Sequence, residues 1–164
     1  MLEQDNLFGE SRQSVKFLTL FCDGASRGKP PGESSAGLVL FNQKLKAEKS
    51  KLLTKIEVEP IWKNGFRLGK TTNNWAEWQA LILGMEYILA NFEPNIPVQV
   101  FLDSNLVVEQ INKNWQVKNP DLQILYKKAN KLAQNFDQIS FQHIFREYNS
   151  KADAMANWAL DQID

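Results

Sequence analysis

Residues 74–103, NWAEWQALILGMEYILANFEPNIPVQVFLD, decide the fold of this chain. The first part predicts an amphipathic helix over 74–92, because its apolar residues recur at three- and four-residue spacing: Trp78, Leu81, Ile82, Met85, Ile88, Leu89 and Phe92. Pro94 and Pro97 close the helix, and residues 98–102 predict a short apolar strand. A helical crossover joins strands that run parallel. We therefore expect residues 98–102 to lie parallel to the first strand of the chain.

The remaining elements surround this crossover. Residues 24–32 are rich in glycine and proline and predict a loop, and Lys63-Asn64-Gly65 predicts a turn. The pattern is weakest over 42–70. The other predicted elements are strands at 15–23, 36–41, 51–62 and 139–148, and helices at 105–112, 120–136 and 151–163. Three strands followed by alternating helices and strands predict an α/β domain with a mixed sheet.

Length and composition indicate one ordinary globular domain. The chain has 164 residues and a formal net charge of zero, so charge alone does not indicate a nucleic-acid-binding protein. A single cysteine, Cys22, excludes an internal disulfide and a cysteine zinc site, and we expect a cytoplasmic protein. Residues 1–14 are polar and acidic, which predicts a disordered leader rather than a secretory signal. No apolar run approaches the ~20 residues of a membrane span.

Four acidic residues stand where predicted strands end or predicted helices begin. Asp23 ends the first strand, Asp103 ends the strand 98–102, Glu77 lies at the start of the long helix and Asp153 at the start of the last helix. The carboxyl ends of parallel strands are where α/β sheets place their sites. Carboxylate oxygens are the ligands that Mg²⁺ prefers. The pattern therefore predicts a carboxylate site for Mg²⁺ in a phosphodiester hydrolase.

Each acid also has a structural explanation. Asp23-Gly24 is a common turn pair, and Asp103 is a candidate helix cap. Asn74-x-x-Glu77 and Ser150-x-x-Asp153 both match a capping box. The metal site is favoured by convergence, because two acids end strands expected to be neighbours and two begin helices that can pack beside them.

Four motifs in order resemble type 1 ribonuclease H, over residues 16–160: Asp23-Gly24-Ala25-Ser26-Arg27-Gly28, Thr72-Asn73-Asn74-x-Ala76-Glu77, Asp103-Ser104-x-Leu106-Val107 and Arg146-Glu147-Tyr148-Asn149-x-x-Ala152-Asp153. The resemblance implies a ribonuclease H-like fold, with a five-stranded mixed sheet flanked by helices, as a catalytic domain over 15–164. It implies hydrolysis of the RNA strand of RNA–DNA hybrids with two Mg²⁺ ions, or Mn²⁺ as a substitute, leaving 5′-phosphate and 3′-hydroxyl ends. Asp23 would bridge both ions, Glu77 and Asp103 would complete one site, and Asp153 the other.

The resemblance also implies roles for residues outside the carboxylates. Readers of the RNA 2′-hydroxyl would be Ser26, Asn73, Asn74, Glu77 and Asn105. Trp115 lies near the position where the family packs an aromatic ring on the DNA strand, although core packing explains it equally well. Candidate phosphate contacts are Arg27, Lys29, Lys113, Lys118 and Lys151, for which a solvated surface is the alternative.

The chain also departs from the family's longer bacterial members. Residues 115–120 connect two helices almost directly, so the basic helix and loop of those members are absent and this is a short form. Their catalytic-loop histidine has no counterpart, because the only histidine, His143, falls within a predicted strand as a packing residue. Arg146, Glu147 and Asn149 occupy the corresponding region as candidate auxiliary residues. The loop reads Lys29-Pro30-Pro31-Gly32 in place of the family's Asn-Pro-Gly.

Three functions are consistent with these residues. The first is a monomeric hybrid endonuclease without a membrane or an obligate protein partner. The second is a non-catalytic module of the same fold that binds nucleic acid or protein, although such a module has no need for all four acids. The third is a related metal nuclease with another substrate, for which the Thr72-Asn73-Asn74 segment has less use.

Overall fold

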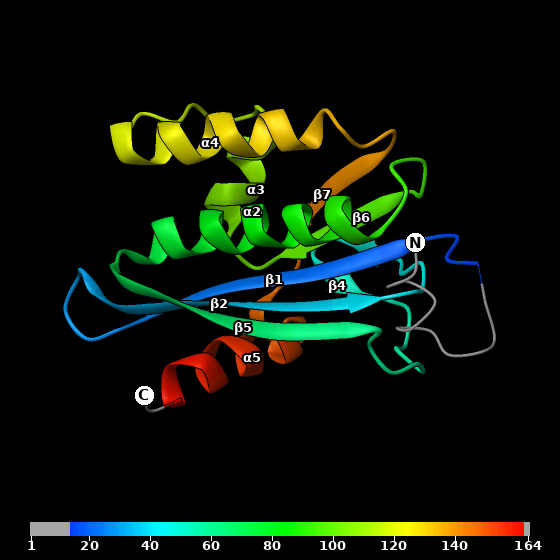
Figure 1. The fold of residues 1–164 in the computed structure, drawn as a ribbon, viewed down its shortest axis with the longest axis horizontal. Coiled ribbons are helices and arrows are strands. Elements are labelled where there is room, and N and C mark those ends of the chain that lie inside the picture. The colour runs from blue at the N-terminus through cyan, green and yellow to red at the C-terminus, as the bar shows by residue number, and fades with distance from the viewer. Residues whose placement is uncertain (1–13, 163–164) are drawn as a thin grey trace.

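The computed structural model describes residues 14–162, so the predicted leader falls almost wholly outside the described residues. Its centre is a five-stranded sheet with helices on both faces (Figure 1). The strand order is β5-β2-β1-β6-β7, with bounds Leu18–Arg27 for β1, Gly32–Phe41 for β2, Trp62–Thr71 for β5, Val98–Leu102 for β6 and Ile139–His143 for β7. β1 pairs antiparallel with β2 and parallel with β6. The predicted mixed sheet and parallel crossover are confirmed.

The first two strands are longer than predicted. Residues 23–27 of β1 pair with residues 33–37 of β2, so the glycine-rich stretch 24–32 is mostly strand and only residues 28–31 form the loop. Helix α2 (Asn73–Asn91) packs directly on Gly24, where an added Cβ would lie 2.4 Å from the backbone nitrogen of Glu77. The glycine therefore indicates close packing, where the sequence pattern indicated a turn.

The predicted third strand at 51–62 was wrong. The third strand of the sheet is β5, which begins at Trp62 and contains the Lys63-Asn64-Gly65 segment expected as a turn. A Cβ on Gly65 would lie 2.3 Å from the carbonyl oxygen of Met155, so this glycine admits a helix against the strand. Residues 51–52 belong instead to a small separate hairpin, β3 (Ala47–Glu48) with β4 (Lys51–Leu52).

The helices divide between the two faces of the sheet. Helices α2 (Asn73–Asn91), α3 (Asn105–Ile111) and α4 (Pro120–Ala133) lie on one face, and α5 (Ser150–Asp161) lies on the other (Figure 1). The larger core fills the first face, and it includes Leu20, Leu38, Trp78 and Met85. A smaller core around Phe21, Phe41 and Phe101 fills the second. In the described part of the chain, no helix has the length and apolarity that crossing a membrane requires.

The ends of several elements differ from the expected ones. Strand β7 stops at His143, and a short 3₁₀ helix, η1 (Arg146–Tyr148), separates it from α5. Helix α4 ends at Ala133, three residues before the expected end. These differences leave residues 144–149 as a connection at the carboxyl end of β7, beside the predicted site.

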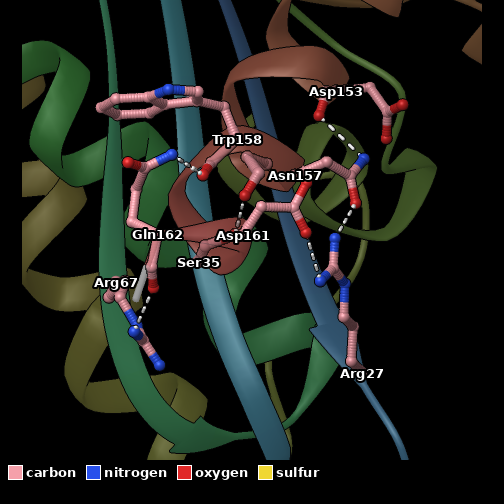
Figure 2. Close-up of polar contacts among 9 residues, drawn as sticks. Arg27, Ser35, Arg67, Asp153, Asn157, Trp158, Asp161 and Gln162 are labelled. Atoms are coloured by element: carbon pink, nitrogen blue, oxygen red, sulfur yellow. Dashed lines mark hydrogen bonds and ion pairs between the residues drawn. The ribbon is translucent and has the colours of Figure 1, made fainter. Parts of the chain in front are cut away.

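Helix α5 is attached to the sheet by close backbone contact and by polar side chains. A Cβ on Gly37 would lie 2.0 Å from the carbonyl oxygen of Ala152, and the Ser35 hydroxyl donates a hydrogen bond to the carbonyl oxygen of Ala156 at 2.6 Å. At the tip of β1, Arg27 forms an ion pair with Asp161 at 2.7 Å (Figure 2). These contacts fix the position of the helix that carries Asp153.

Candidate active site

Two of the predicted site residues meet because their strands are neighbours. Cys22 of β1 is in register with Leu102 of β6, the last pair between these two parallel strands, so Asp23 and Asp103 follow side by side where the pairing ends. Asp103 directly follows β6, whereas Asp23 lies within β1, which continues to Arg27 paired with β2 alone. Asp23 is 5% exposed, and the Asp103 side chain is 6% exposed. The predicted neighbourhood of the two acids is confirmed, but the expectation that Asp23 ends the first strand was wrong.

Glu77 joins these two residues because α2 starts earlier than the capping-box interpretation assumed. The N-cap is Thr72, whose hydroxyl accepts a hydrogen bond from the backbone N–H of Trp75 at 3.2 Å. Glu77 therefore does not reach back to cap the helix. Because Gly24 has no side chain, the Glu77 backbone packs directly on β1. The Glu77 carboxylate therefore lies beside those of Asp23 and Asp103.

The other capping interpretations are also wrong. Ser104, not Asp103, caps α3: its hydroxyl accepts from the backbone N–H of Val107 at 3.3 Å. Helix α5 begins at Ser150, after an N-cap at Asn149 that makes no side-chain capping bond, so the expected box with Asp153 does not form. The four acids are thus not explained by helix capping.

Three of the four carboxylates form a group able to hold a divalent cation. Asp23, Glu77 and Asp103 each offer one oxygen, and these oxygens lie within 4.8 Å of one another. Asp153 is outside this group but lines the same cavity, of about 420 Å³, together with Ser104 and Arg146. The structure therefore brings all four acids to one cavity, and three of them form the group that could share one cation.

The electrostatics of the group favour a cation. Burial, with the charges of Glu77 and Asp103, raises the pKa of Asp23 from 3.8 to about 10. Burial and the charge of Asp103 raise the pKa of Glu77 from 4.5 to about 8, against a smaller effect of a hydrogen bond from the Gly24 backbone. Burial also raises the pKa of Asp103, which Arg146 opposes. A cation at this position would offset both the burial and the mutual repulsion that hold these pKa values high.

Buried oxygens without a hydrogen bond give a second indication of a metal. Among residues 14–162, Glu77 Oε2 and Asp103 Oδ2 are buried and accept no hydrogen bond from the protein, and Asp103 Oδ2 has only the Arg146 guanidinium as an ion-pair partner, at 3.9 Å. Buried oxygens without a donor are costly unless something else satisfies them. Two such oxygens, in the group of three carboxylates, fit the ligand preference of Mg²⁺ or Mn²⁺.

The predicted substrate-binding residues do not all reach the cavity. Ser26, Asn73 and Asn74 line it, and the Ser26 hydroxyl donates to the carbonyl oxygen of Thr71 at 3.2 Å. Asn105 is the first residue of α3, is exposed and does not line the cavity. Its neighbour Ser104 does, and the sequence reasoning missed it. The signal was present as an N-cap residue directly after an acid.

The candidate auxiliary residues have different environments. Arg146 is 90% exposed, and its Nε lies 3.9 Å from Asp103 Oδ2, so it stands at the mouth of the cavity. Glu147 is exposed and does not line the cavity. Asn149 is buried, and its amide donates to the carbonyl oxygen of Cys22 at 2.8 Å, which makes it a structural residue.

His143 ends β7, where the sequence placed it, and both of its ring nitrogens have partners. Nδ1 lies 2.7 Å from the hydroxyl of Ser50, and Nε2 lies 3.2 Å from the backbone oxygen of Asp103. The ring also packs edge-on against Phe145. The histidine is thus a packing and bridging residue beside the site, as expected for a residue within a strand.

The more distant predicted contacts divide into two groups. Trp115 is 48% exposed, so it is not a core residue, and it lines a surface cavity of about 980 Å³ with Lys113 and Lys118. Arg27 is engaged with Asp161 and Asn157 on α5 (Figure 2). Lys29 and Lys151 are exposed.

The fold and the site define a class of protein: a domain with the sheet of the ribonuclease H fold and a group of carboxylates beside the point where its parallel strands β1 and β6 stop pairing. The family described as "Reverse transcriptase-like" matches residues 61–159. Ribonuclease HI of Halobacterium salinarum is 35% identical over 141 residues, which cover 86% of this chain and 63% of that protein. The bifunctional protein Rv2228c of Mycobacterium tuberculosis is 36% identical over 139 residues, 85% of this chain and 34% of that protein. The chain thus spans about a third of the mycobacterial relative.

Solved structures agree with these matches. The crystal structure of RNase H1 from Halobacterium salinarum has a TM-score of 0.72 and 33% identity, covering 88% of this chain and 97% of that one. The N-terminal RNase H domain of Rv2228c has a TM-score of 0.70 and 35% identity, covering 88% and 98%. LC11-RNase H1, solved in complex with an RNA/DNA hybrid, has a TM-score of 0.73 and 28% identity, covering 88% and 96%. The chain belongs to the type 1 ribonuclease H family.

Proposed function

We propose that the protein is an endonuclease that hydrolyses the RNA strand of RNA–DNA hybrids with divalent cations, leaving 5′-phosphate and 3′-hydroxyl ends. The observation that carries the proposal is the group of three carboxylates, Asp23, Glu77 and Asp103, which lines a cavity and includes two buried oxygens without a hydrogen bond. Family membership supports the same activity.

The proposed metal ligands follow from the arrangement of the acids. Asp23 is central, because its carboxylate interacts with those of both Glu77 and Asp153. Glu77 and Asp103 would complete one cation site with Asp23, and Asp153 would complete a second. Mg²⁺ is the proposed ion and Mn²⁺ a substitute, since both accept hard oxygen ligands. Two such cations supply an activated water and stabilise charge on the phosphate.

Selectivity for RNA requires polar groups near the 2′-hydroxyl of the strand being cut. Ser26, Asn73 and Asn74 line the cavity that holds the carboxylates, and they come from two different elements. We propose that these residues position the RNA strand, so that its phosphate faces the acids. Asn105 lies outside the cavity, at the exposed start of α3, and we propose that it contributes through its backbone.

Arg146 is the proposed auxiliary residue. Its guanidinium lies at the mouth of the cavity, 3.9 Å from Asp103, where a phosphate would enter or leave. We expect Arg146→Gln to change the turnover rate, because Arg146 assists product release or proton transfer. Glu147 is the second candidate for this role, and Glu147→Gln is therefore combined with Arg146→Gln in a double variant. Unchanged turnover in the double variant would exclude an auxiliary role for both residues.

A substrate panel tests the proposed function. The protein is incubated in Mg²⁺ with an RNA–DNA hybrid, an RNA duplex and a DNA duplex of one sequence, each labelled on one strand at a time. The proposal predicts cleavage of the RNA strand of the hybrid and an intact DNA strand. Cleavage of the DNA duplex would indicate a different metal nuclease, and hybrid binding without any cleavage would indicate a non-catalytic module.

The same proposal includes a cytoplasmic, monomeric enzyme. The cytoplasmic location is supported by Cys22, whose thiol is buried and free, as suits a reducing compartment. Light scattering in solution tests the monomer, for which the expected mass is 18.8 kDa. A mass of twice this value would contradict it.

A further inference from the structure

The hairpin β3–β4 is a lysine-rich segment that the carboxylate site does not explain. Residues 44–55 contain five lysines and one glutamate in a chain whose net charge is zero. All five lysines are exposed. Two of them have partners: Lys46 forms an ion pair with Glu48 at 3.2 Å, and the Lys44 ammonium lies 5.6 Å from the centre of the Phe17 ring. Lys49 and Lys51 pair with no carboxylate of residues 14–162.

The turn that carries these two lysines has an unusual backbone. Lys49 and Ser50 connect β3 to β4 with φ angles of 49° and 65°, although neither is glycine. Positive φ at both central residues is the two-residue hairpin turn that favours Asn and Gly. A non-glycine residue in this conformation costs about 1 kcal/mol or more unless its surroundings hold it. Lys49 therefore occupies a turn position that its residue type does not favour.

The turn is held against the edge of the active site. The backbone N–H of Phe145 donates to the carbonyl oxygen of Ser50 at 2.9 Å, one residue before Arg146. The Ser50 hydroxyl meets Nδ1 of His143 at 2.7 Å, and Nε2 of the same ring meets the backbone oxygen of Asp103 at 3.2 Å. A single imidazole ring thus joins the hairpin turn to the backbone of a site carboxylate.

We infer that Lys49 and Lys51 form a phosphate-binding surface for the RNA–DNA hybrid, beside the carboxylates and next to Arg146. The inference rests on the proposed function for the identity of the duplex, and on the hairpin's contacts for its position. This chain lacks the basic helix and loop of the longer family members, since α3 ends at Ile111 and α4 begins at Pro120 with no helix between them. The hairpin supplies local positive charge at a different place.

Phosphate contacts have a measurable signature. Each lysine that neutralises a phosphate releases bound counterions, and the slope of log affinity against log salt steepens by about 0.9 per contact. Such contacts carry no base information. Loss of the two lysines should therefore weaken the binding of a hybrid and of a DNA duplex of equal length by similar factors.

The test compares two pairs of substitutions in the full chain. The hairpin pair is Lys49→Asn with Lys51→Gln, in which asparagine keeps the left-handed backbone of the turn accessible. The control pair is Lys16→Gln with Lys131→Gln: Lys16 precedes β1 and Lys131 lies in the last turn of α4, so both are at the opposite end of the sheet from the carboxylates. Melting temperatures equal to that of the parent establish that both pairs fold.

Binding of a fluorescent hybrid is measured in Mg²⁺ at several salt concentrations, in an Asp103→Asn background that leaves the hybrid intact. We expect the hairpin pair to weaken binding about 3- to 10-fold near 100 mM salt and to make the salt slope shallower by about 1 to 2, with the control pair unchanged. An unchanged slope in the hairpin pair, or an equal loss in the control pair, would overturn the inference.

Cleavage by the chain without the background substitution separates this inference from the proposed function. If the parent cuts the hybrid and the hairpin pair changes neither KM nor the salt slope, only the hairpin surface is wrong. If the parent binds the hybrid with the hairpin-dependent slope but cuts nothing, the surface stands and the enzymatic function is wrong.

Discussion

The side-chain amide of Asn149 donates a hydrogen bond of 2.8 Å to the backbone carbonyl oxygen of Cys22. Cys22 directly precedes Asp23, and Asn149 lies four residues before Asp153, whose backbone N–H donates to the backbone carbonyl oxygen of Asn149 at 3.0 Å. Asn149 therefore links the strand segment of one site acid, through its side-chain amide, to the first turn of the helix that carries another, through its backbone carbonyl.

Removal of this amide should disturb both stability and activity. We expect Asn149→Ala to lower the free energy of unfolding by about 1–3 kcal/mol, because the buried carbonyl of Cys22 loses its donor. We also expect the variant to reduce kcat more than it raises KM. Asn135→Ala is the matched control, since this exposed amide also donates to a backbone carbonyl, that of Lys131. Urea unfolding and hybrid cleavage provide the two readouts, and equal effects in both variants would contradict the assigned role.

The metal-free protein should become less stable as pH rises. The folded-state pKa values of Asp23 and Glu77, about 10 and about 8, lie above their ordinary values of 3.8 and 4.5. Between pH 3.8 and about 10 for Asp23, and between pH 4.5 and about 8 for Glu77, the folded state binds more protons than the unfolded state. The free energy of unfolding therefore falls as pH rises through these ranges. We expect Tm in EDTA to fall from pH 5 to pH 9.

Mg²⁺ should reverse most of this fall, because a cation favours the charged carboxylates. The rise in Tm on adding Mg²⁺ is therefore expected to be larger at pH 8 than at pH 5. A metal effect of equal size at both pH values would contradict the assignment of these acids as ligands. Thermal unfolding followed by circular dichroism, with Ca²⁺-free buffers and EDTA as the reference, makes the measurement.

Asp23→Asn should separate stability from activity. At pH 8 the folded metal-free protein keeps the Asp23 carboxyl protonated, with a pKa of about 10, whereas the unfolded chain ionises it. An amide does not ionise in either state and so removes this cost of folding, and we expect the metal-free variant to gain at least about 1–2 kcal/mol at pH 8. Activity should fall at least about 100-fold, because the central ligand is lost. Asp137→Asn, an exposed acid outside the site, is the control. A variant that is less stable than the parent at pH 8 would show that the acids do not repel each other as described.

Gly24→Ala tests the approach of α2 to β1. Its Cβ would lie 2.4 Å from the backbone nitrogen of Glu77, where no flexible side chain can move aside. We expect a loss of about 1–3 kcal/mol in stability and a large loss of activity from the displaced carboxylate. Gly28→Asn is the comparison, because nothing lies within 4 Å of a Cβ there and asparagine tolerates its φ of +85°. Retained activity in Gly24→Ala would show that Glu77 does not need this contact.

The elements with strong periodicity were predictable from the sequence, and so was the meeting of the acids where the parallel pairing ends, although Asp23 lies within its strand and does not end it. The long helix α2 and strand β6 lie within one residue of their expected bounds, which placed Asp23 beside Asp103 in advance. Glycines were the main source of error. Gly24 and Gly65 indicate turns by residue type alone, but both serve close helix packing from distant parts of the chain.

The remaining differences also depend on contacts between distant segments. The hairpin β3–β4 has only two residues in each strand, and its turn is held by His143 and Phe145, about 95 residues away in sequence. Local preference cannot predict such a turn, since Lys49 and Ser50 are poor residues for positive φ. The sequence also could not decide which residue caps α2 and α3. The actual caps, Thr72 and Ser104, stand beside Asn73 and Asp103, which are equally good capping residues.

The most direct test of the central claim is the cleavage of an RNA–DNA hybrid labelled on its RNA strand, in Mg²⁺ and separately in Mn²⁺, with Asp103→Asn alongside. The account predicts that the parent cuts the RNA strand in at least Mg²⁺, that the products carry 5′-phosphate ends, and that the variant, although folded, does not cut. A folded parent that binds the hybrid and leaves its RNA strand intact in both metals would contradict the account.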